Sequence, residues 1–119
     1  MAGLESRDFS APDETRTPDK TTVELVNLAG GQIGRYTFQP GWRWSECIKP
    51  VVGTDSCQTE HVGYCVTGRL HVKHEDGTEG EVGPGDVYRV APGHDAWTVG
   101  DEPAVFVEFQ GAANYAKPA

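Results

Sequence analysis

Short runs in which apolar and polar residues alternate recur along the chain, and turns containing glycine or proline separate them. Alternation with a period of two indicates β-strands with one buried face, and no stretch carries a convincing helical repeat. Between two of the runs lies the dipeptide 76–77 (Asp-Gly), which is typical of a two-residue hairpin turn. The pattern predicts strands at residues 22–28, 32–38, 42–48, 61–67, 70–75, 78–82, 87–90, 96–99 and 104–109.

The strand at 87–90 is the most sharply bounded of these. The turn 83–86 (Gly-Pro-Gly-Asp) precedes it and the turn 91–94 (Ala-Pro-Gly-His) follows it. Glycine adopts backbone angles that other residues avoid, and proline lacks the N–H that a strand ladder needs, so both favour strand ends. Many short strands with closely spaced turns usually close into a barrel or a jelly roll. The predicted fold class is therefore all-β.

With 119 residues, the chain is long enough for one domain around one core. Residues 1–20 are rich in acidic residues and lack apolar periodicity. We expect them to form an N-terminal arm, flexible or packed along the barrel, with Leu4 and Phe9 as anchors. Residues 21–110 are predicted to form the barrel, and residues 111–119 a loose C-terminal tail.

The charge balance narrows the range of partners. A formal net charge of −8 argues against nucleic acid and anionic membranes, because both attract a basic surface. No apolar run approaches the roughly 20 residues that cross a bilayer. The first residues also lack the charged-then-apolar order of a secretory signal, so we expect a cytoplasmic protein.

The chain contains three cysteines, Cys47, Cys57 and Cys65. An odd number in a chain without a secretory signal favours free thiols or metal ligands over a disulfide framework. A disulfide between Cys47 and Cys57 is the alternative if the protein is exported.

Glycines and possible ligands follow a regular spacing in the first half of the predicted barrel. Gly41 is followed by five residues and then by Cys47 and Lys49, and six residues separate His61 from Gly68. This spacing resembles the first motif of the cupin superfamily, whose members are small β-barrels of jelly-roll type. In that motif, the positions of Cys47, Lys49 and His61 belong to His, His and Glu.

A second spacing resembles the second cupin motif. Gly85 is followed by five residues, by Ala-Pro-Gly at 91–93, and by His94. Ala96 then stands where the motif has its last His, and Gly100 where it has Asn. The resemblance covers residues 23–109, and it implies a cupin-type jelly-roll β-barrel.

The resemblance also implies a divalent metal inside the barrel. Of the four motif positions for ligands, only those of Cys47 and His61 hold residues that can bind a metal here. His94 is a candidate substitute, because it lies two residues before the last ligand position and on the same face of an extended strand. Cys57, in the insertion before His61, is another. These donors favour zinc, with iron, nickel or copper as alternatives. The competing interpretation is that the cysteines are small buried residues and His94 is a turn residue.

Strand alternation extends this site. If residues 42–48 are extended, every second side chain shares the inward face of Cys47, and the same holds for residues 61–67 and His61. A basic side chain in such a pocket would hold a carboxylate. The residues that motif and alternation place in the substrate pocket are Arg43, Ser45, Lys49 and Cys65.

The same alternation places Trp42, Trp44 and Tyr64 on the outer face of the barrel. An exposed aromatic patch of that size is unusual on a monomer, so it needs cover from the N-terminal arm or a second subunit. We expect a homodimer.

Together these features predict a small single-domain cupin that binds a small, anionic molecule in its barrel through an atypical Cys/His metal site. Two alternatives stay open at this point. The first is a metal-dependent enzyme of the dioxygenase, isomerase or decarboxylase type. The second is a metal-free binder or dimerisation scaffold. Fold resemblance does not separate them, because one fold hosts many activities.

Overall fold

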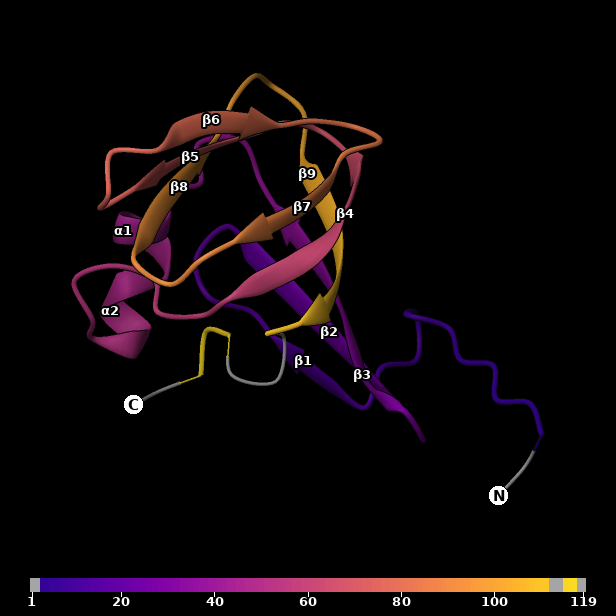
Figure 1. Cartoon of the computed structure of the whole chain (residues 1–119). Helices are drawn as coiled ribbons and strands as arrows, with labels where there is room; N and C mark the ends of the chain where they lie inside the picture. The colour runs from indigo at the N-terminus through magenta and orange to yellow at the C-terminus, as the bar shows by residue number, and fades with distance from the viewer. Residues whose placement is uncertain (1–2, 112–114, 118–119) are drawn as a thin grey trace.

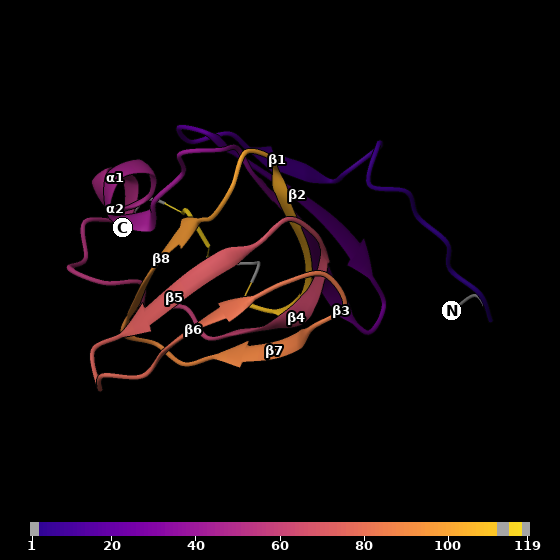
Figure 2. The same ribbon diagram turned by 90° about the horizontal axis from the view of Figure 1, so that it is seen from above.

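The computed structural model describes residues 3–111 and 115–117, which form two antiparallel β-sheets around a common core (Figure 1 and Figure 2). Two one-turn helices, α1 at Trp44–Cys47 and α2 at Lys49–Val52, lie between β3 and β4. The strands are β1 (Glu14–Arg16), β2 (Thr21–Leu28), β3 (Gly31–Phe38), β4 (His61–Thr67), β5 (Leu70–His74), β6 (Glu79–Val82), β7 (Val87–Val90), β8 (His94–Thr98) and β9 (Ala104–Gln110).

The larger sheet has the strand order β1-β2-β3-β9-β4-β7, and the smaller sheet has the order β6-β5-β8. All of these neighbouring strands pair antiparallel. The last strand, β9, lies between β3 and β4, so the chain returns to the middle of the larger sheet. This arrangement confirms the prediction of an all-β jelly roll.

The core lies between the two sheets and consists of the inward-facing side chains of the strands. Tyr36 of β3 and Phe106 of β9 are paired across the sheet, and each is 1% exposed. The ring of Phe38 stacks on Trp42 with 3.9 Å between ring centroids, and the Trp42 indole N–H donates to the Thr21 hydroxyl at 2.8 Å. Burying an aromatic side chain of this kind contributes roughly 1.5–3 kcal/mol. The inward-facing side chains of the smaller sheet pack against these aromatic residues.

Residues 42–48 differ from the predicted strand, because α1 occupies most of the segment. The chain then turns into α2, which has Pro50 in its first turn and ends at Gly53 in the left-handed conformation, with φ 79°. A single helical turn is too short to leave an apolar repeat in the sequence, so alternation analysis does not detect it.

The helical turn also overturns the predicted orientation of the tryptophans. Trp42 and Trp44 are each 2% exposed, so the prediction that both face outward is wrong. In α1, Trp44 and Cys47 are three residues apart, lie on the same helix face, and are both buried. Of the three aromatic residues that were predicted to need cover, only Tyr64 is exposed, at 41%.

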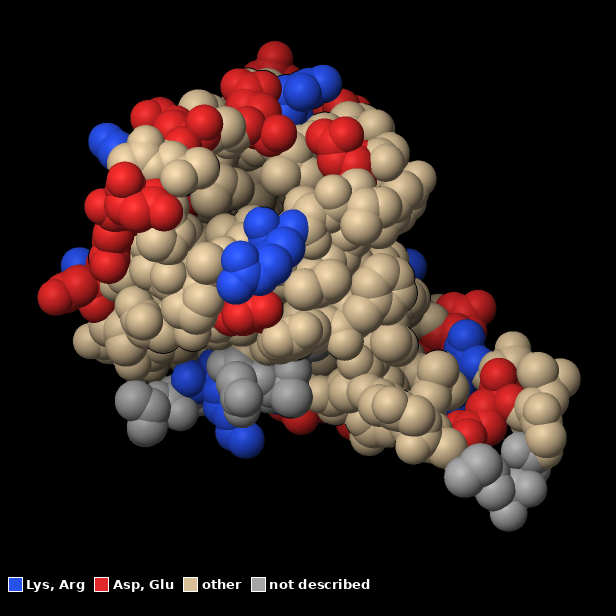
Figure 3. Space-filling view, in the orientation of Figure 1, with Lys and Arg blue, Asp and Glu red and all other residues tan. Residues whose placement is uncertain are grey.

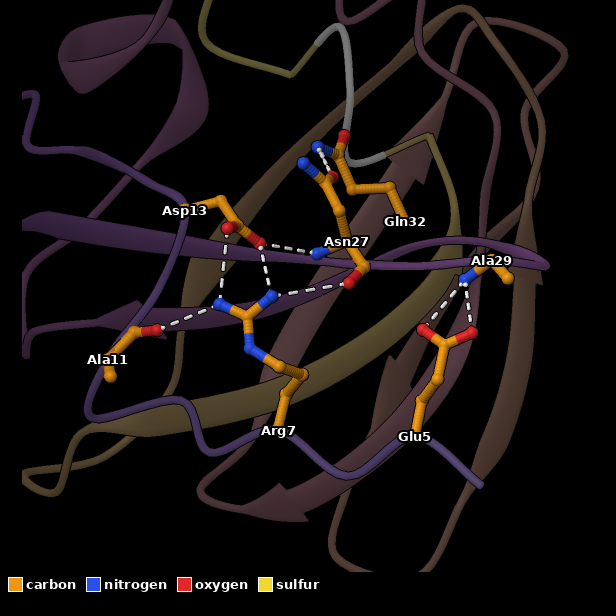
Figure 4. A network of polar contacts seen from close by, with 7 residues as sticks. All are labelled: Glu5, Arg7, Ala11, Asp13, Asn27, Ala29 and Gln32. Carbon is orange, nitrogen blue, oxygen red and sulfur yellow. Dashed lines mark hydrogen bonds and ion pairs between the residues drawn. The ribbon is translucent and has the colours of Figure 1, made fainter. Parts of the chain in front are cut away.

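The N-terminal arm runs beside the hairpin that joins β2 and β3 (Figure 4). The Arg7 guanidinium donates to both carboxylate oxygens of Asp13 at 3.1 Å, and the Glu5 carboxylate accepts the backbone N–H of Ala29. Asp13 also accepts the N–H of Asn27 at 2.7 Å. Polar contacts therefore tie the arm to the barrel.

Of the two predicted anchors of the arm, one packs and one does not. The Arg35 guanidinium lies over the Phe9 ring, 5.0 Å from its centroid, whereas Leu4 is 81% exposed. The arm also contributes β1, which pairs with β2 and extends the larger sheet.

The described part of the C-terminal tail, residues 115–117, is not a loose end. Tyr115 is 3% exposed and Ala116 6% exposed. The Tyr115 ring lies 4.7 Å from the Tyr36 ring, and Arg16 of β1 donates to the Tyr115 carbonyl at 2.6 Å. The predicted tail therefore carries a side chain that completes the core.

The two sheets leave a groove between their edge strands β6 and β7. Its volume is about 350 Å³, and Val72, Tyr88 and Val90 are among the residues that line it. Acidic side chains gather near β5 and β6, on the same side of the molecule (Figure 3).

Across the described residues, no helix combines the length and apolar character that a membrane crossing requires.

Candidate metal centre

Three buried side chains converge at one end of the barrel interior, those of Cys57, His61 and His94. One potential ligand atom from each lies within 4.8 Å of the other two. His61 begins β4 and His94 begins β8, so the two sheets contribute one imidazole each. Their ring centroids are 5.1 Å apart.

The backbone positions Cys57, although it lies in the loop between α2 and β4. Cys57 forms an isolated β-bridge with His94, in which the Cys57 N–H donates to the His94 carbonyl at 2.8 Å. The Gly93 N–H donates to the Cys57 carbonyl at 2.7 Å. These backbone bonds hold the thiol beside the imidazole that begins β8.

Both imidazoles are oriented by hydrogen bonds at Nδ1. His61 Nδ1 donates to the Glu108 carboxylate at 2.6 Å, and His94 Nδ1 donates to the Ala91 carbonyl at 2.7 Å. Each Nε2 is then left for another interaction, and His61 Nε2 lies 3.6 Å from the Cys57 sulfur. Ligand histidines in metal sites are typically held in this way, by a carboxylate or carbonyl on the second ring nitrogen.

Glu108 is itself held in place by a hydrogen bond from a neighbouring strand. It is 4% exposed, and the Tyr88 hydroxyl donates to its second carboxylate oxygen at 2.5 Å. Gly63 pairs with both residues across β4, β7 and β9. A Cβ at Gly63 would lie 2.5 Å from the Val107 carbonyl oxygen and 2.9 Å from the Tyr88 hydroxyl, so this close approach requires glycine.

Burial alone would favour the neutral forms of the cysteine and the histidine. Burial raises the pKa of Cys57, but hydrogen bonds from His61 and His94 outweigh it and lower that pKa to about 6. Burial lowers the pKa of His61, but the Glu108 charge and the Cys57 hydrogen bond raise it to about 10. At neutral pH the metal-free site is therefore a thiolate paired with an imidazolium.

A small cavity of about 30 Å³ lies next to this cluster, between the two sheets. That space holds about one water molecule. Its polar groups are His61, His94, Glu108, Tyr36 and Tyr88. The other lining residues are a third tyrosine, Tyr115, and the largely apolar Phe38, Trp42, Trp44, Leu70, Val72, Val90, Ala96 and Phe106.

The structure brings together three of the four predicted metal ligands and leaves Cys47 apart. Cys47 lies in α1, and its sulfur is 3.8 Å from a carboxylate oxygen of Asp19. The cluster instead takes its sulfur from Cys57, because the insertion folds back onto β8.

Arg43 and Ser45, predicted for the substrate pocket, lie beside Asp95 and Trp97. The Arg43 guanidinium stacks over the Trp97 ring at 4.2 Å and is 3.7 Å from Asp95. The Ser45 N–H donates to the Asp95 carboxylate at 3.2 Å. Neither residue is among those that line the inner cavity.

Lys49 and Cys65, the other two predicted pocket residues, also lie outside the cavity lining. Lys49 is 3.8 Å from the exposed Asp55 carboxylate. Cys65 is fully buried, its sulfur contacts the carbonyl oxygens of Thr67 and Gly68, and burial raises its pKa to about 11.

Sequence reasoning missed Glu108, although β9 carries a signal for it. The inward positions of this strand alternate as Ala104, Phe106 and Glu108, so a carboxylate stands where the pattern calls for an apolar residue. A buried charge at such a position needs a partner, which His61 provides.

The residues present fit a divalent metal. One thiolate and two imidazoles are donors that zinc takes in proteins, and three protein donors leave a position open for a further ligand. Cys57, His61 and His94 would hold the ion, and Glu108 would keep His61 in the orientation that directs Nε2 toward it.

No sequence family and no curated protein matches the chain. Solved structures match its fold, and one of them is a protein of unknown function from Rhizobium leguminosarum, with a TM-score of 0.65 at 19% identity over 99% of this chain and 100% of that one. The polyketide cyclase RemF from Streptomyces resistomycificus matches with a TM-score of 0.61 at 15% identity, over 88% of this chain and 77% of that one.

The oxalate decarboxylase of Lactobacillus farciminis matches with a TM-score of 0.58 at 14% identity, over 90% of this chain and 33% of that one. These likenesses define the class of fold, a cupin-like jelly-roll barrel. Identities this low establish the fold alone, so the chemistry has to be argued from the residues of this chain.

Proposed function

We propose that this protein binds a divalent metal ion through Cys57, His61 and His94, and that the ion holds a small molecule inside the barrel. The observation that carries the proposal is the convergence of three buried donors within 4.8 Å. Zinc is favoured by the mixture of one thiolate and two imidazoles, with iron, nickel and copper as alternatives. The bound ion would supply Lewis acidity to an oxygen atom of the ligand.

The chain's own residues support this role in two ways. Glu108 and Ala91 orient the imidazoles, and the apolar walls of the cavity keep bulk water from the ligand position. Val72, Tyr88 and Val90 line both the inner cavity and the groove between β6 and β7. This shared wall favours a ligand that enters along the groove and places one small end group in the cavity.

A cytoplasmic location belongs to the same proposal. All three cysteines have free thiols, and free thiols are typical of a reducing compartment, where disulfides are rare. The net charge of −8 supports a small-molecule ligand over nucleic acid or an anionic membrane.

The test is the metal content of untagged protein purified without chelator, measured by plasma mass spectrometry. We expect one zinc ion per chain. Cys57→Ala and His94→Ala each remove one ligand from the cluster, so each is expected to weaken zinc binding at least about tenfold.

Cys47→Ala and Cys65→Ala are the matched controls, because both thiols are buried but lie outside the cluster. We expect both variants to keep full zinc stoichiometry while remaining folded by circular dichroism. A wild-type protein that stays metal-free after dialysis against zinc contradicts the proposal. Loss of zinc in Cys47→Ala alone would return the ligand role to Cys47.

A further inference from the structure

One buried hydroxyl at the inner cavity, that of Tyr36, lacks a hydrogen-bond partner in the part of the chain that the structure describes. It is buried without a hydrogen-bond partner among the described residues, and the side chain as a whole is 1% exposed. A buried hydroxyl without a partner is unfavourable, and native structures contain few of them. Its presence beside a cavity points to a group that occupies the cavity.

The position of Tyr36 directs it to the candidate metal centre. It is an inward-facing residue of β3, opposite Phe106 of β9, and it lines the same cavity as His61 and His94. Its ring meets the His61 ring edge-on, with 6.1 Å between centroids, and lies against Tyr115 at 4.7 Å. Tyr36 therefore faces the space that the two imidazoles border.

The two imidazoles, the Glu108 carboxylate and the Tyr88 hydroxyl at the cavity already have partners. His61 and Tyr88 donate to Glu108, and His94 donates to Ala91. Burial and the Glu108 charge raise the pKa of Tyr36 well above its usual value, so the hydroxyl keeps its proton at neutral pH. It is a neutral donor at the cavity. The Glu108 carboxylate is the acceptor nearest to it in effect, but that carboxylate already accepts from His61 and Tyr88, and no described residue makes a hydrogen bond of normal geometry with the Tyr36 hydroxyl.

We infer that Tyr36 is a ligand-binding residue, whose hydroxyl donates a hydrogen bond to an oxygen atom bound at the metal held by Cys57, His61 and His94. This inference rests on the proposed function. The cavity of about 30 Å³ restricts the group beside Tyr36 to a very small one, such as a water molecule or one end of a carboxylate. The ligand class is a small oxygen donor, selected by one metal ion and one phenol.

The experiment uses full-length protein loaded with cobalt(II), whose visible absorption reports its ligands, and formate as the probe, because it is the smallest carboxylate. We expect Tyr36→Phe to bind cobalt as well as the wild type does, and to bind formate about five- to tenfold more weakly, the effect of one hydrogen bond. Tyr64→Phe is the matched control, since Tyr64 is an exposed tyrosine on the outer face of β4.

A second measurement separates ligand binding from a structural role. In metal-free protein, Tyr36→Phe removes a buried hydroxyl that forms no hydrogen bond with any described residue, so its melting temperature is expected to stay the same or rise by a few degrees. A fall of several degrees would show that the hydroxyl has a structural partner and would overturn the inference.

The remaining outcomes distinguish the two proposals. If wild-type protein takes up no cobalt, the metal centre itself is wrong. If wild type and Tyr36→Phe both take up cobalt, but formate fails to bind or binds equally to both, the metal centre stands and the role of Tyr36 is overturned.

Discussion

At the scale of single residues, Cys57 and His61 act as one titrating unit in the metal-free protein. The pKa of Cys57 falls from 9.0 to about 6, so its contribution to stability is complete above pH 9 and is lost as the pH falls toward 6. The pKa of His61 rises from 6.5 to about 10, so its contribution is complete below pH 6.5 and is lost as the pH rises toward 10. Between pH 6.5 and 9, the contribution of Cys57 to the free energy of unfolding rises with pH and that of His61 falls, so the two changes oppose each other.

This opposition predicts how Cys57→Ser changes the pH dependence of stability. The substitution removes the thiolate and the part of the His61 pKa shift that Cys57 causes, but the Glu108 charge still raises that pKa. The remaining contribution of His61, which falls as the pH rises, is then without compensation. We expect the free energy of unfolding of the variant to drop below that of the wild type increasingly from pH 6.5 to 9, by at most about 1.4 kcal/mol per pH unit. Urea denaturation of metal-free protein across this range measures the difference.

Cys65→Ser is the control for this measurement. Burial raises the pKa of Cys65 to about 11, so this thiol stays protonated in the folded protein up to that pH. The difference between Cys65→Ser and the wild type is therefore expected to change by less than about 0.5 kcal/mol from pH 6.5 to 9, because the unfolded thiol only begins to ionise near pH 9. Parallel curves for Cys57→Ser and the wild type would contradict the paired titration.

At the scale of elements, β4 makes room for the site by carrying glycine at position 63. A methyl group there would collide with the backbone of β9 and with Tyr88, which holds Glu108. We expect Gly63→Ala to lower the free energy of unfolding by about 1–3 kcal/mol and to weaken zinc binding, because Glu108 can no longer hold His61 as it does now. Chemical denaturation and metal titration check the two effects.

Gly80→Ala is the matched variant for this prediction. Gly80 lies in the edge strand β6, and a Cβ there would meet no atom within 4 Å. We expect its stability to change by less than about 0.5 kcal/mol and its zinc affinity to stay the same. Equal behaviour of the two variants would rule out the role given to position 63.

The sequence predicts most of these elements because each strand repeats its own apolar alternation, and β2, β3, β4 and β9 lie where that alternation places them. It does not predict α1 and α2, since one helical turn leaves no period to detect. The candidate site likewise contains residues that the sequence predicts and a residue that it does not predict. His61, His94 and Cys57 could be named as metal donors because the resemblance to the cupin motifs implies a metal and these residues carry suitable donor atoms. The partnership of Glu108 with His61 depends on strands 47 residues apart in the chain, which local patterns do not reveal.

At the scale of the whole molecule, the homodimer remains a prediction, on a different surface from the one first expected. Trp42 and Trp44 are buried, so they cannot form the dimer interface that the sequence suggested. Large apolar side chains are exposed on the outer side of β4, β7 and β9, and in these strands they are Tyr64, Val66, Val87 and Phe109. Apolar side chains gathered on one sheet face are typical of surfaces that bind another subunit.

We expect light scattering coupled to size-exclusion chromatography to give twice the mass of one chain. Val87→Glu places a charge on the most exposed of these residues and is expected to shift the mass to that of a monomer. Leu4→Glu is the control, because Leu4 is 81% exposed on the N-terminal arm. A monomer mass for the wild type would end the dimer hypothesis.

The burial of Tyr115 has a practical consequence for anyone who purifies this protein. Its ring packs 5.3 Å from the ring of His61, so a polyhistidine tag added at the C-terminal end would hang only a few residues from the metal donors. Nickel bound to such a tag, or competition of the tag for zinc, would give a wrong value for the number of metal ions per chain. The segment before β1 lies on the side of the barrel away from residues 115–117 (Figure 1), so a cleavable tag belongs at that end of the chain.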